Sequence, residues 1–437
     1  MFGYYIWLAA ISIRKNAVMS VLMIAAVAVG IGTCMTIVTV NYIMAKDPIP
    51  QKSDVLYAVQ LDSWNPNDSF RDDGRPPDQL TYTDAMALMA EQPAFRQTAM
   101  VGTSLVVQPD DPDSKPFQAS GRAAYADFFA MFDTPFLFGS GWDADADRRQ
   151  EQVVVLSREM NDRLFGGENS VGENLTLVGH EYRVVGVLDT WEPMPKFYDV
   201  TTGPYDPPEE LFVPFSLVAA LELPRNGNTN CWKPVGGDGF GAFLASECIW
   251  IQFWAELRDD AEKREYLAFL DNYVNDQKAL GRFSRPLNNR VNDVNEWMDA
   301  MQVVDSNATM MLPVSIMFLA VCLLNTIGLL LAKFLGKAPE IGLRRALGAS
   351  KRALFVQYLI ESGCVGVAGG LVGVLLTWLG LRGIEALFGD LVENLVQLDI
   401  VMVTSAVVLA IVSSIAAGLY PTWRACNVEP AAQLKSQ

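Results

Sequence analysis

Few residues in this chain are of a type and spacing that could do chemistry. The one histidine, His180, lies in the turn-like stretch GHEY, where a lone imidazole is most often a surface residue. No G-x-x-x-x-G-K-[ST] phosphate loop occurs, and no His/Cys cluster has the spacing of a metal site. The stretch GGDGFG lacks the strand–turn–helix setting of a dinucleotide site. We therefore expect no catalytic residue, no metal and no cofactor in this chain.

Glu361 lies at the edge of a long apolar segment, and carboxylates at membrane depth are functional candidates by default. No chain of polar residues accompanies it that could carry protons or ions. The favoured interpretation is therefore structural, with Arg344 or Arg345 on the nearby basic segment as the expected partner.

That basic segment is PEIGLRRALGASKR, residues 339–352, and it predicts a short helix. Pro339 suits the first helical position, and Gly348 suits the stop. Glu340 precedes Arg344 by four residues, which is the better orientation for a helical ion pair.

Four apolar segments are long enough to cross a membrane. Runs without a charged residue cover 17–45, 308–332, 362–381 and 400–423, with 29, 25, 20 and 24 residues. A bilayer core of ~30 Å needs about 20 apolar residues as a helix. We expect transmembrane helices at 17–45, 309–332, 353–381 and 400–423.

Lys and Arg near the ends of these segments predict the orientation. Residues 333–352, between the second and third spans, carry six basic residues against one acid. These residues and both termini, including the tail 424–437, are therefore expected in the cytoplasm. Residues 46–308 and the short loop 382–399 are expected on the outer side.

Residues 1–16 do not read as a signal peptide, because the apolar run that follows is too long and no small-residue cleavage site closes it. The stretch FGYYIWLAAISIRK instead predicts an amphipathic helix in the inner membrane interface. The first span is therefore expected to stay uncleaved.

Residues 46–308 are long enough for a core of their own and hold 43 Asp/Glu against 22 Lys/Arg. Such an acidic surface suits solubility and counts against a nucleic-acid partner. IWIQFWAEL, residues 249–257, alternates as a strand with one buried side, and an amphipathic helix follows it. Short β-rich runs separated by Gly and Asn turns predict a β-rich region at about 120–245. Within it, residues 190–240 are rich in Pro, Gly, Asn and Trp, which favours an ordered irregular region over a partner surface.

Two of the six cysteines, Cys231 and Cys248, lie in the outer segment, on the side of a membrane that permits disulfides. They are 17 residues apart, so a bridge is the favoured interpretation, and two unpaired buried thiols are the alternative.

Residues 291–305 combine helical periodicity with a position just before the second span. We expect a helix that continues from the outer domain into the membrane as a stalk; the alternative is a capped helix that ends before Asn307. The expected stalk residues are Val291, Val294, Trp297, Met301 and Val304.

The third span holds two interlocked G-x-x-x-G patterns, and small residues at this spacing let helices approach closely. Tight packing of this kind leaves no obvious pore. The residues predicted to pack are Gly366, Gly369, Gly370 and Gly373.

Residues 340–350, EIGLRRALGAS, resemble the signature of FtsX/MacB-type ABC transporter permeases. The C-terminal stretch AGLYPTWRACNVEPAAQLK is similar to the closing motif of that family. In the outer segment, YADFFAMFDTPFLFGSGW, VVVLSREMNDRLFGGENSVGENLTL and YRVVGVL look like the MacB-type periplasmic core domain. Motifs and topology together cover nearly the whole chain in the family's order.

The resemblance implies an α-helical membrane protein with four transmembrane helices and a large α+β periplasmic domain. In that domain a β-rich, sabre-like subdomain, at about 120–245, would be inserted in a porter-like one. It also implies a dimer that works by mechanotransmission, in which ATP binding in the cytoplasm moves the outer domains. The basic helix would be a coupling helix that docks on the ATPase through Ile341 and Leu343 as apolar anchors; alternatively, its arginines only anchor the loop to anionic lipid. The implied coupling residues are Glu340, Ile341, Gly342, Leu343, Arg344, Arg345, Leu347 and Gly348.

Unlike MacB, the chain begins directly with its membrane part, which implies a separate ATPase subunit that binds ATP and Mg. The stretch FLGKAPEIG lacks the family's usual extra charged residues, which leaves open whether the permease pairs with itself or with a related permease. The resemblance further implies a periplasmic adaptor, an outer-membrane channel, and a place among the lipids of the bacterial inner membrane.

The predicted function is that of a non-catalytic permease subunit that drives export of a periplasmic substrate, such as a peptide, toxin, macrolide-like compound or lipoprotein. The alternative is a signal-transmitting FtsX-like permease that regulates a periplasmic cell-wall hydrolase. The size of the outer segment favours the exporter. A membrane-bound enzyme is disfavoured because no catalytic constellation occurs.

Overall fold

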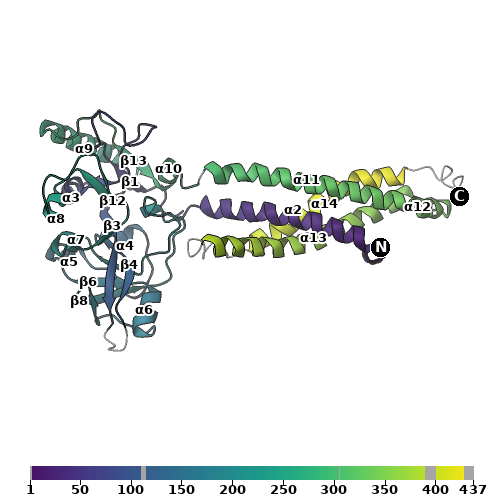
Figure 1. Cartoon of the computed structure of the whole chain (residues 1–437), viewed down its shortest axis with the longest axis horizontal. Helices are drawn as coiled ribbons and strands as arrows, with labels where there is room; N and C mark the ends of the chain where they lie inside the picture. The colour runs from purple at the N-terminus through teal and green to yellow at the C-terminus, as the bar shows by residue number, and fades with distance from the viewer. Residues whose placement is uncertain (1, 110–114, 305, 389–399, 428–437) are drawn as a thin grey trace. The chain divides into compact units, whose positions relative to one another are not determined.

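The structure is a computed structural model, and it describes residues 2–109, 115–304, 306–388 and 400–427. The chain forms two compact units (Figure 1). The membrane unit consists of Met1–Ala45 and Val304–Gln437, and the α/β unit consists of Lys46–Val303.

The membrane unit is a bundle of helices, the secondary structure that satisfies its own backbone polar groups in lipid. Among the described residues, four helices contain stretches that are long and apolar enough to cross a membrane, Ala17–Met44, Met310–Gly336, Lys351–Ile384 and Val403–Cys426. Its helices are α1 (Phe2–Lys15), α2 (Ala17–Met44), α11 (Ser306–Gly336), α12 (Ala338–Ala346), α13 (Lys351–Phe388) and α14 (Ile400–Cys426).

Each of the four expected spans falls on one of these long helices. The expected loop 382–399 is helical at its start, because α13 continues to Phe388. The rest of that loop, and the tail from residue 428 onward, lie outside the described residues.

Four glycines of α13 lie where this helix packs against α2 and α14. Gly369 and Gly373 face α2, and a Cβ at Gly369 would lie 2.7 Å from Val27 Cγ1. Gly366 and Gly370 face α14 at similarly short range. The two interlocked patterns therefore serve two different helix contacts, each close enough to exclude a side chain.

The α/β unit is built on a mixed sheet that has 13 strands among the described residues. Its main order is β13-β1-β12-β3-β4-β9-β6-β8-β5, and β4 pairs with β9, and β6 with β8, in parallel. The strands are β1 (Leu56–Gln60), β2 (Leu80–Thr81), β3 (Arg96–Gln108), β4 (Phe117–Ala124), β5 (Phe136–Gly139), β6 (Val153–Leu156), β7 (Asn174–Leu177), β8 (His180–Leu188), β9 (Leu211–Pro214), β10 (Arg225–Asn226), β11 (Asn230–Cys231), β12 (Cys248–Glu256) and β13 (Arg290–Asp293).

Short helices connect these strands, and one long helix follows β12. The helices are α3 (Tyr82–Glu91), α4 (Asp127–Met131), α5 (Ala144–Arg149), α6 (Arg158–Phe165), the 3₁₀ turn η1 (Phe197–Asp199), α7 (Ser216–Ala220), α8 (Phe240–Leu244), α9 (Asp260–Ala279) and α10 (Val294–Ala300). The strands of residues 120–245 extend the same sheet, because β4 pairs with the long strand β3.

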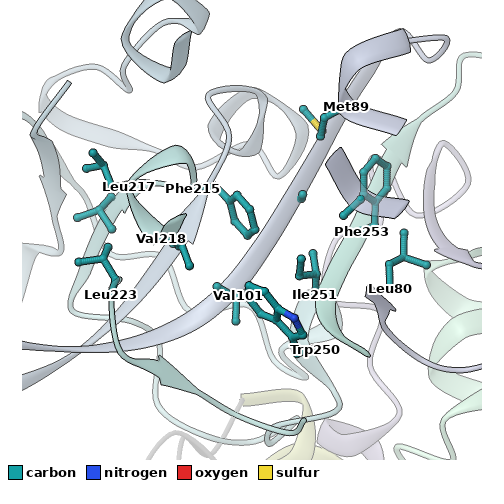
Figure 2. Packing of buried hydrophobic residues seen from close by; sticks show 14 of the residues in the cluster. Leu80, Met89, Val101, Phe215, Leu217, Val218, Leu223, Trp250, Ile251 and Phe253 are labelled. Atoms are coloured by element: carbon teal, nitrogen blue, oxygen red, sulfur yellow. The ribbon is translucent and has the colours of Figure 1, made fainter. Parts of the chain in front are cut away.

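The strand β12 is buried on both faces, so the expectation of one buried side is wrong. It lies between β1 and β3. Phe253 and Ala255 belong to one hydrophobic cluster, and Trp254, which points the other way, belongs to a second. Figure 2 shows the first cluster, with Trp250 of β12 close to Val101 of β3.

The expected continuous stalk over residues 291–305 is also wrong. Val291 lies in β13 and pairs with Val59 of β1, so this part of the helical pattern is a strand. The helix α10 begins only at Val294, where Asp293 and Glu296 form a reciprocal capping box.

Helix α10 ends at Ala300, and Gln302 has a left-handed φ of 53°. Trp297 is buried in the core of the α/β unit, and Met301 packs against the same cluster. Val304 follows the last residue of that unit. The structure therefore has the alternative, a capped helix that ends before residue 307, because its apolar face covers the sheet.

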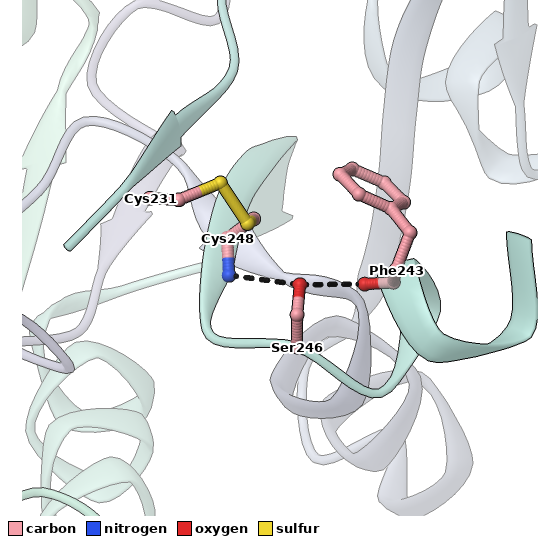
Figure 3. The surroundings of a disulfide bond; sticks show 4 residues. All are labelled: Cys231, Phe243, Ser246 and Cys248. Atoms are coloured by element: carbon pink, nitrogen blue, oxygen red, sulfur yellow. Dashed lines mark hydrogen bonds between the residues drawn. A yellow bond between two sulfur atoms is a disulfide. The ribbon is translucent and has the colours of Figure 1, made fainter. Parts of the chain in front are cut away.

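The structure joins Cys231 and Cys248 by a disulfide (Figure 3). The two residues are direct partners in the antiparallel pairing of β11 with β12, which sets their Cα atoms 4.2 Å apart. Beside the bridge, Ser246 Oγ accepts a hydrogen bond from the Cys248 amide and donates one to the Phe243 carbonyl. The disulfide therefore fastens the irregular segment before β12 to the central strand.

Candidate functional site

The local sequence of α12 sets both ends of the helix. Pro339 lies in its first turn, where a backbone N–H is not needed. At the other end Gly348 has a φ of 102°, and its amide donates to the Arg345 carbonyl. Ser350 then caps α13, because its hydroxyl accepts a hydrogen bond from the Ala353 amide.

The apolar side chains of α12 point in two directions. Ile341 is only 2% exposed and packs in a cluster with Phe334 and Tyr358. Leu343 and Leu347 are 63% and 80% exposed. Ile341 therefore attaches the helix to the bundle, and the expectation that it anchors a partner is wrong, because its side chain is already covered. Leu343 and Leu347 are the exposed apolar side chains.

The charged residues of α12 are partly engaged within the unit. Arg344 donates to Glu340, one turn earlier, at 2.6 Å, and to Gln357 of α13 at 3.3 Å. Glu340 is exposed, whereas Arg345 and Gly342 are partly buried. An exposed pair four residues apart typically contributes only about 0.3–0.5 kcal/mol, so Glu340 and Arg344 remain available to a partner at small cost.

Beneath α12, Glu361 of α13 forms a buried ion pair with Lys333 of α11, with Nζ and Oε1 2.8 Å apart. The expectation that Arg344 is the partner of Glu361 is wrong, because Arg344 donates to Glu340 and Gln357 and Lys333 pairs with Glu361. Glu361 and Lys333 are 1% and 3% exposed.

Three more polar side chains complete this cluster. Lys337, the residue before α12, lies 3.7 Å from Glu361. The hydroxyl of Ser12, in α1, donates to Glu361 and accepts from Lys337. Ser20, in α2, accepts from Lys333 at 3.1 Å. We call Ser12, Ser20, Lys333, Lys337 and Glu361 the charged cluster.

Two comparisons with family models cover most of the chain. Residues 20–264 match the MacB-like periplasmic core domain, and residues 313–430 match the FtsX-like permease C-terminal domain. The chain is a MacB/FtsX-type ABC transporter permease. Helix α12 and most of the charged cluster fall in the FtsX-like region, whereas Ser12 precedes both matched regions.

Known relatives of the permease are distant. It is 24% identical over 304 residues to the macrolide export ATP-binding/permease protein MacB of Bdellovibrio bacteriovorus, covering 68% of this chain and 41% of that protein. It is 22% identical to the pyoverdine export ATP-binding/permease protein PvdT of Pseudomonas entomophila, covering 83% of this chain and 49% of that protein. The permease thus spans less than half the length of these two relatives.

Among solved structures, the periplasmic region of MacB from Actinobacillus actinomycetemcomitans is similar at a TM-score of 0.37 and 17% identity. The alignment covers 58% of this chain and 95% of that one.

Sequence reasoning about the permease missed the two lysines of the charged cluster. Lys333 and Lys337 are four residues apart, and Ile341 follows after four more, which is the spacing of side chains on one face of a continuous helix. This spacing was available in the sequence. The partners Ser12 and Ser20 carried no comparable signal, because a serine in an apolar helix is common.

Proposed function

We propose that this permease couples a separate cytoplasmic ABC ATPase, which binds ATP and Mg, to movements of the α/β unit that drive export of a substrate from the outer side of the inner membrane. In this proposal both termini and α12 face the cytoplasm, and the α/β unit faces the periplasm. The permease works as a dimer, with a second copy or a related permease, and hands its substrate to an adaptor and an outer-membrane channel.

The observation that carries the proposal is the division of apolar side chains on α12. Ile341 seats the helix in the bundle, while Leu343 and Leu347 are exposed beside the Glu340–Arg344 pair. Exposed leucines next to charged groups suit the groove of a soluble protein, which can bury the apolar surface and pair with the charges.

The names of the relatives support an export function over signalling, since those proteins are described as macrolide and pyoverdine export proteins. The basic balance of residues 333–352 supports the cytoplasmic placement of α12.

The test replaces Leu343 and Leu347 together by alanine in the full-length permease, coexpressed with its ATPase. Burying a leucine side chain typically contributes about 1.5–3 kcal/mol, so the double variant should bind the ATPase at least about tenfold more weakly. Copurification from detergent, followed by titration of the purified partners, measures this.

Leu280→Ala is the matched control, because Leu280 is also exposed but lies at the end of α9 in the α/β unit. It should bind the ATPase normally. If the leucines of α12 only rest in lipid, the double variant will insert poorly, but the correctly inserted fraction will bind the ATPase as the wild type does. That result would overturn the proposal.

A further inference from the structure

The charged cluster lies at the point where α11 passes into α12. Lys333 is in the last turns of α11, Lys337 is the residue between the two helices, and Ile341 is buried one turn into α12. The two helices are joined by the single residue Lys337, so α12 is attached directly to the end of α11. A displacement of α12 therefore acts on Lys337 and, through the end of α11, on the Lys333–Glu361 pair.

Glu361 gathers groups from the other helices at this point. Its carboxylate accepts from Ser12 of α1 and pairs with Lys333, which in turn donates to Ser20 of α2. One carboxylate of α13 thus connects directly or through one lysine to α1, α2 and α11.

Stability alone does not account for this arrangement. A buried ion pair costs several kcal/mol of desolvation per ion, and replacing both partners by apolar residues is often neutral or stabilising. Two helices that meet through apolar side chains can slide along each other. Hydrogen bonds between charged groups are directional, so they hold the two helices at one relative position. Two lysines also compete for one carboxylate, with Lys333 at 2.8 Å and Lys337 at 3.7 Å.

We propose that Glu361 and Lys333 are positioning residues that transmit motion of α12 to the membrane helices. This inference rests on the proposed function, because it assumes that α12 docks on an ATPase. In this scheme the ion pair makes α12, α11 and α13 move together. Lys337, 3.7 Å from the same carboxylate, joins the start of α12 to this pair.

The experiment uses the full permease assembled with its ATPase in lipid nanodiscs, with ATP and Mg for the hydrolysis assay and a non-hydrolysable ATP analogue as the probe for hydrogen exchange. Three quantities are measured: copurification with the ATPase, the rate of ATP hydrolysis, and the nucleotide-dependent change in hydrogen exchange of residues 46–303. No transported substrate is needed.

The main variant replaces the pair by apolar residues, Lys333→Met with Glu361→Leu. We expect it to fold, to bind the ATPase and to hydrolyse ATP within about twofold of the wild type, because no buried charge is left unpaired in this pair. The nucleotide-dependent change in hydrogen exchange should fall at least tenfold. A change as large as in the wild type would overturn the inference, because the pair would then be only structural.

Glu361→Asp keeps the charge but withdraws the carboxylate by one methylene, and it serves if the apolar double variant fails to fold. It should reduce the nucleotide-dependent exchange while leaving the melting temperature nearly unchanged; an unaltered exchange response would again overturn the inference. Ser362→Ala is the matched control, since the Ser362 hydroxyl is buried beside Glu361 but bonds only to the Tyr358 carbonyl of its own helix.

Failure of the proposed function gives a different result. If the wild-type permease binds no ATPase, or shows no nucleotide response although it binds one, the proposed function is wrong for every variant alike. If the wild type responds and the apolar double variant responds equally, only the role assigned to Glu361 and Lys333 is wrong.

Discussion

The two units of the permease each have a buried cluster of charged residues, and the two clusters differ in their ratio of basic to acidic groups. In the α/β unit, Arg122 of β4 contacts Asp199 and donates through Nε to Glu209 at 2.8 Å, and Lys196 lies 3.3 Å from the same carboxylate. Two basic groups there face two acidic groups. In the membrane unit, two lysines face the single carboxylate of Glu361.

This difference indicates different roles. In the balanced set of the α/β unit, Tyr198 also donates to Glu209, and although burial would raise the pKa of Glu209, Arg122 and Lys196 lower it to about 2. Such a set fastens the irregular segment 196–209 to the sheet. The set in the membrane unit has one more basic group than acidic groups, and the ammonium group of the partly exposed Lys337 can extend towards water.

The largest effect that we expect comes from breaking the balanced set. Arg122→Met would leave the carboxylates of Asp199 and Glu209 buried with too little positive charge, at a cost of about 3–5 kcal/mol in the free energy of unfolding. Chemical denaturation of the full-length permease in detergent, followed by tryptophan fluorescence, measures this. Arg183→Met is the control, because Arg183 is exposed in β8 and forms only a long ion pair with Glu151.

The pH dependence gives a second check on the same variant. The pKa of Glu209 is lower in the folded state than its ordinary value of 4.5, so its contribution to stability is present above that value and is lost as the pH falls towards about 2. Arg122→Met should remove most of this acid sensitivity. If Arg122→Met is as stable as Arg183→Met, the buried ion cluster of Arg122 does not hold the segment 196–209 on the sheet.

A smaller loss is expected from removing the covalent link of the α/β unit. Replacing Cys231 and Cys248 together by serine releases a loop of 17 residues, which typically costs about 3 kcal/mol. Reducing agent should lower the melting temperature of the wild type and leave the variant unchanged. Non-reducing peptide mapping that finds both as free thiols would contradict the bridge.

Local features of the sequence predicted the membrane unit well. Long uncharged runs predict helices because lipid leaves the backbone no other partners, and Pro339 and Gly348 fix the ends of α12 through their own backbone limits. The two G-x-x-x-G patterns are likewise local, and their spacing already fixes two faces of one helix.

Contacts between distant segments could not be predicted in this way. Val291 pairs with Val59, which is far from it in the chain. This pairing places Val291 in a strand, and the helical periodicity of the sequence around residue 291 could not indicate it. The choice of Lys333 over Arg344 as the partner of Glu361 is of the same kind, because it depends on how α11 and α13 rotate against each other. The inward direction of Ile341 depends on the same packing.

The smallest effect that we expect concerns packing without charge, and it compares two glycines of α13. Gly→Ala in a helix gains about 1 kcal/mol of intrinsic helix propensity at either position. At Gly363 the new Cβ would lie 3.7 Å from Ile415 Cγ1, an ordinary contact. At Gly369 it would lie 2.7 Å from Val27 Cγ1 and 2.9 Å from Val27 Cβ, and the β-branched side chain of Val27 cannot turn away from both.

Overpacking of this kind typically costs about 1–3 kcal/mol, more than the gain in propensity. Gly363→Ala should therefore leave the melting temperature in detergent unchanged or slightly raised, and Gly369→Ala should lower it by a few degrees. The opposite signs make the comparison robust to any general effect of alanine on the helix. Equal shifts at the two positions would mean that α2 and α13 do not meet at Gly369. The stability of the membrane unit would then depend more on the Lys333–Glu361 ion pair than the structure indicates.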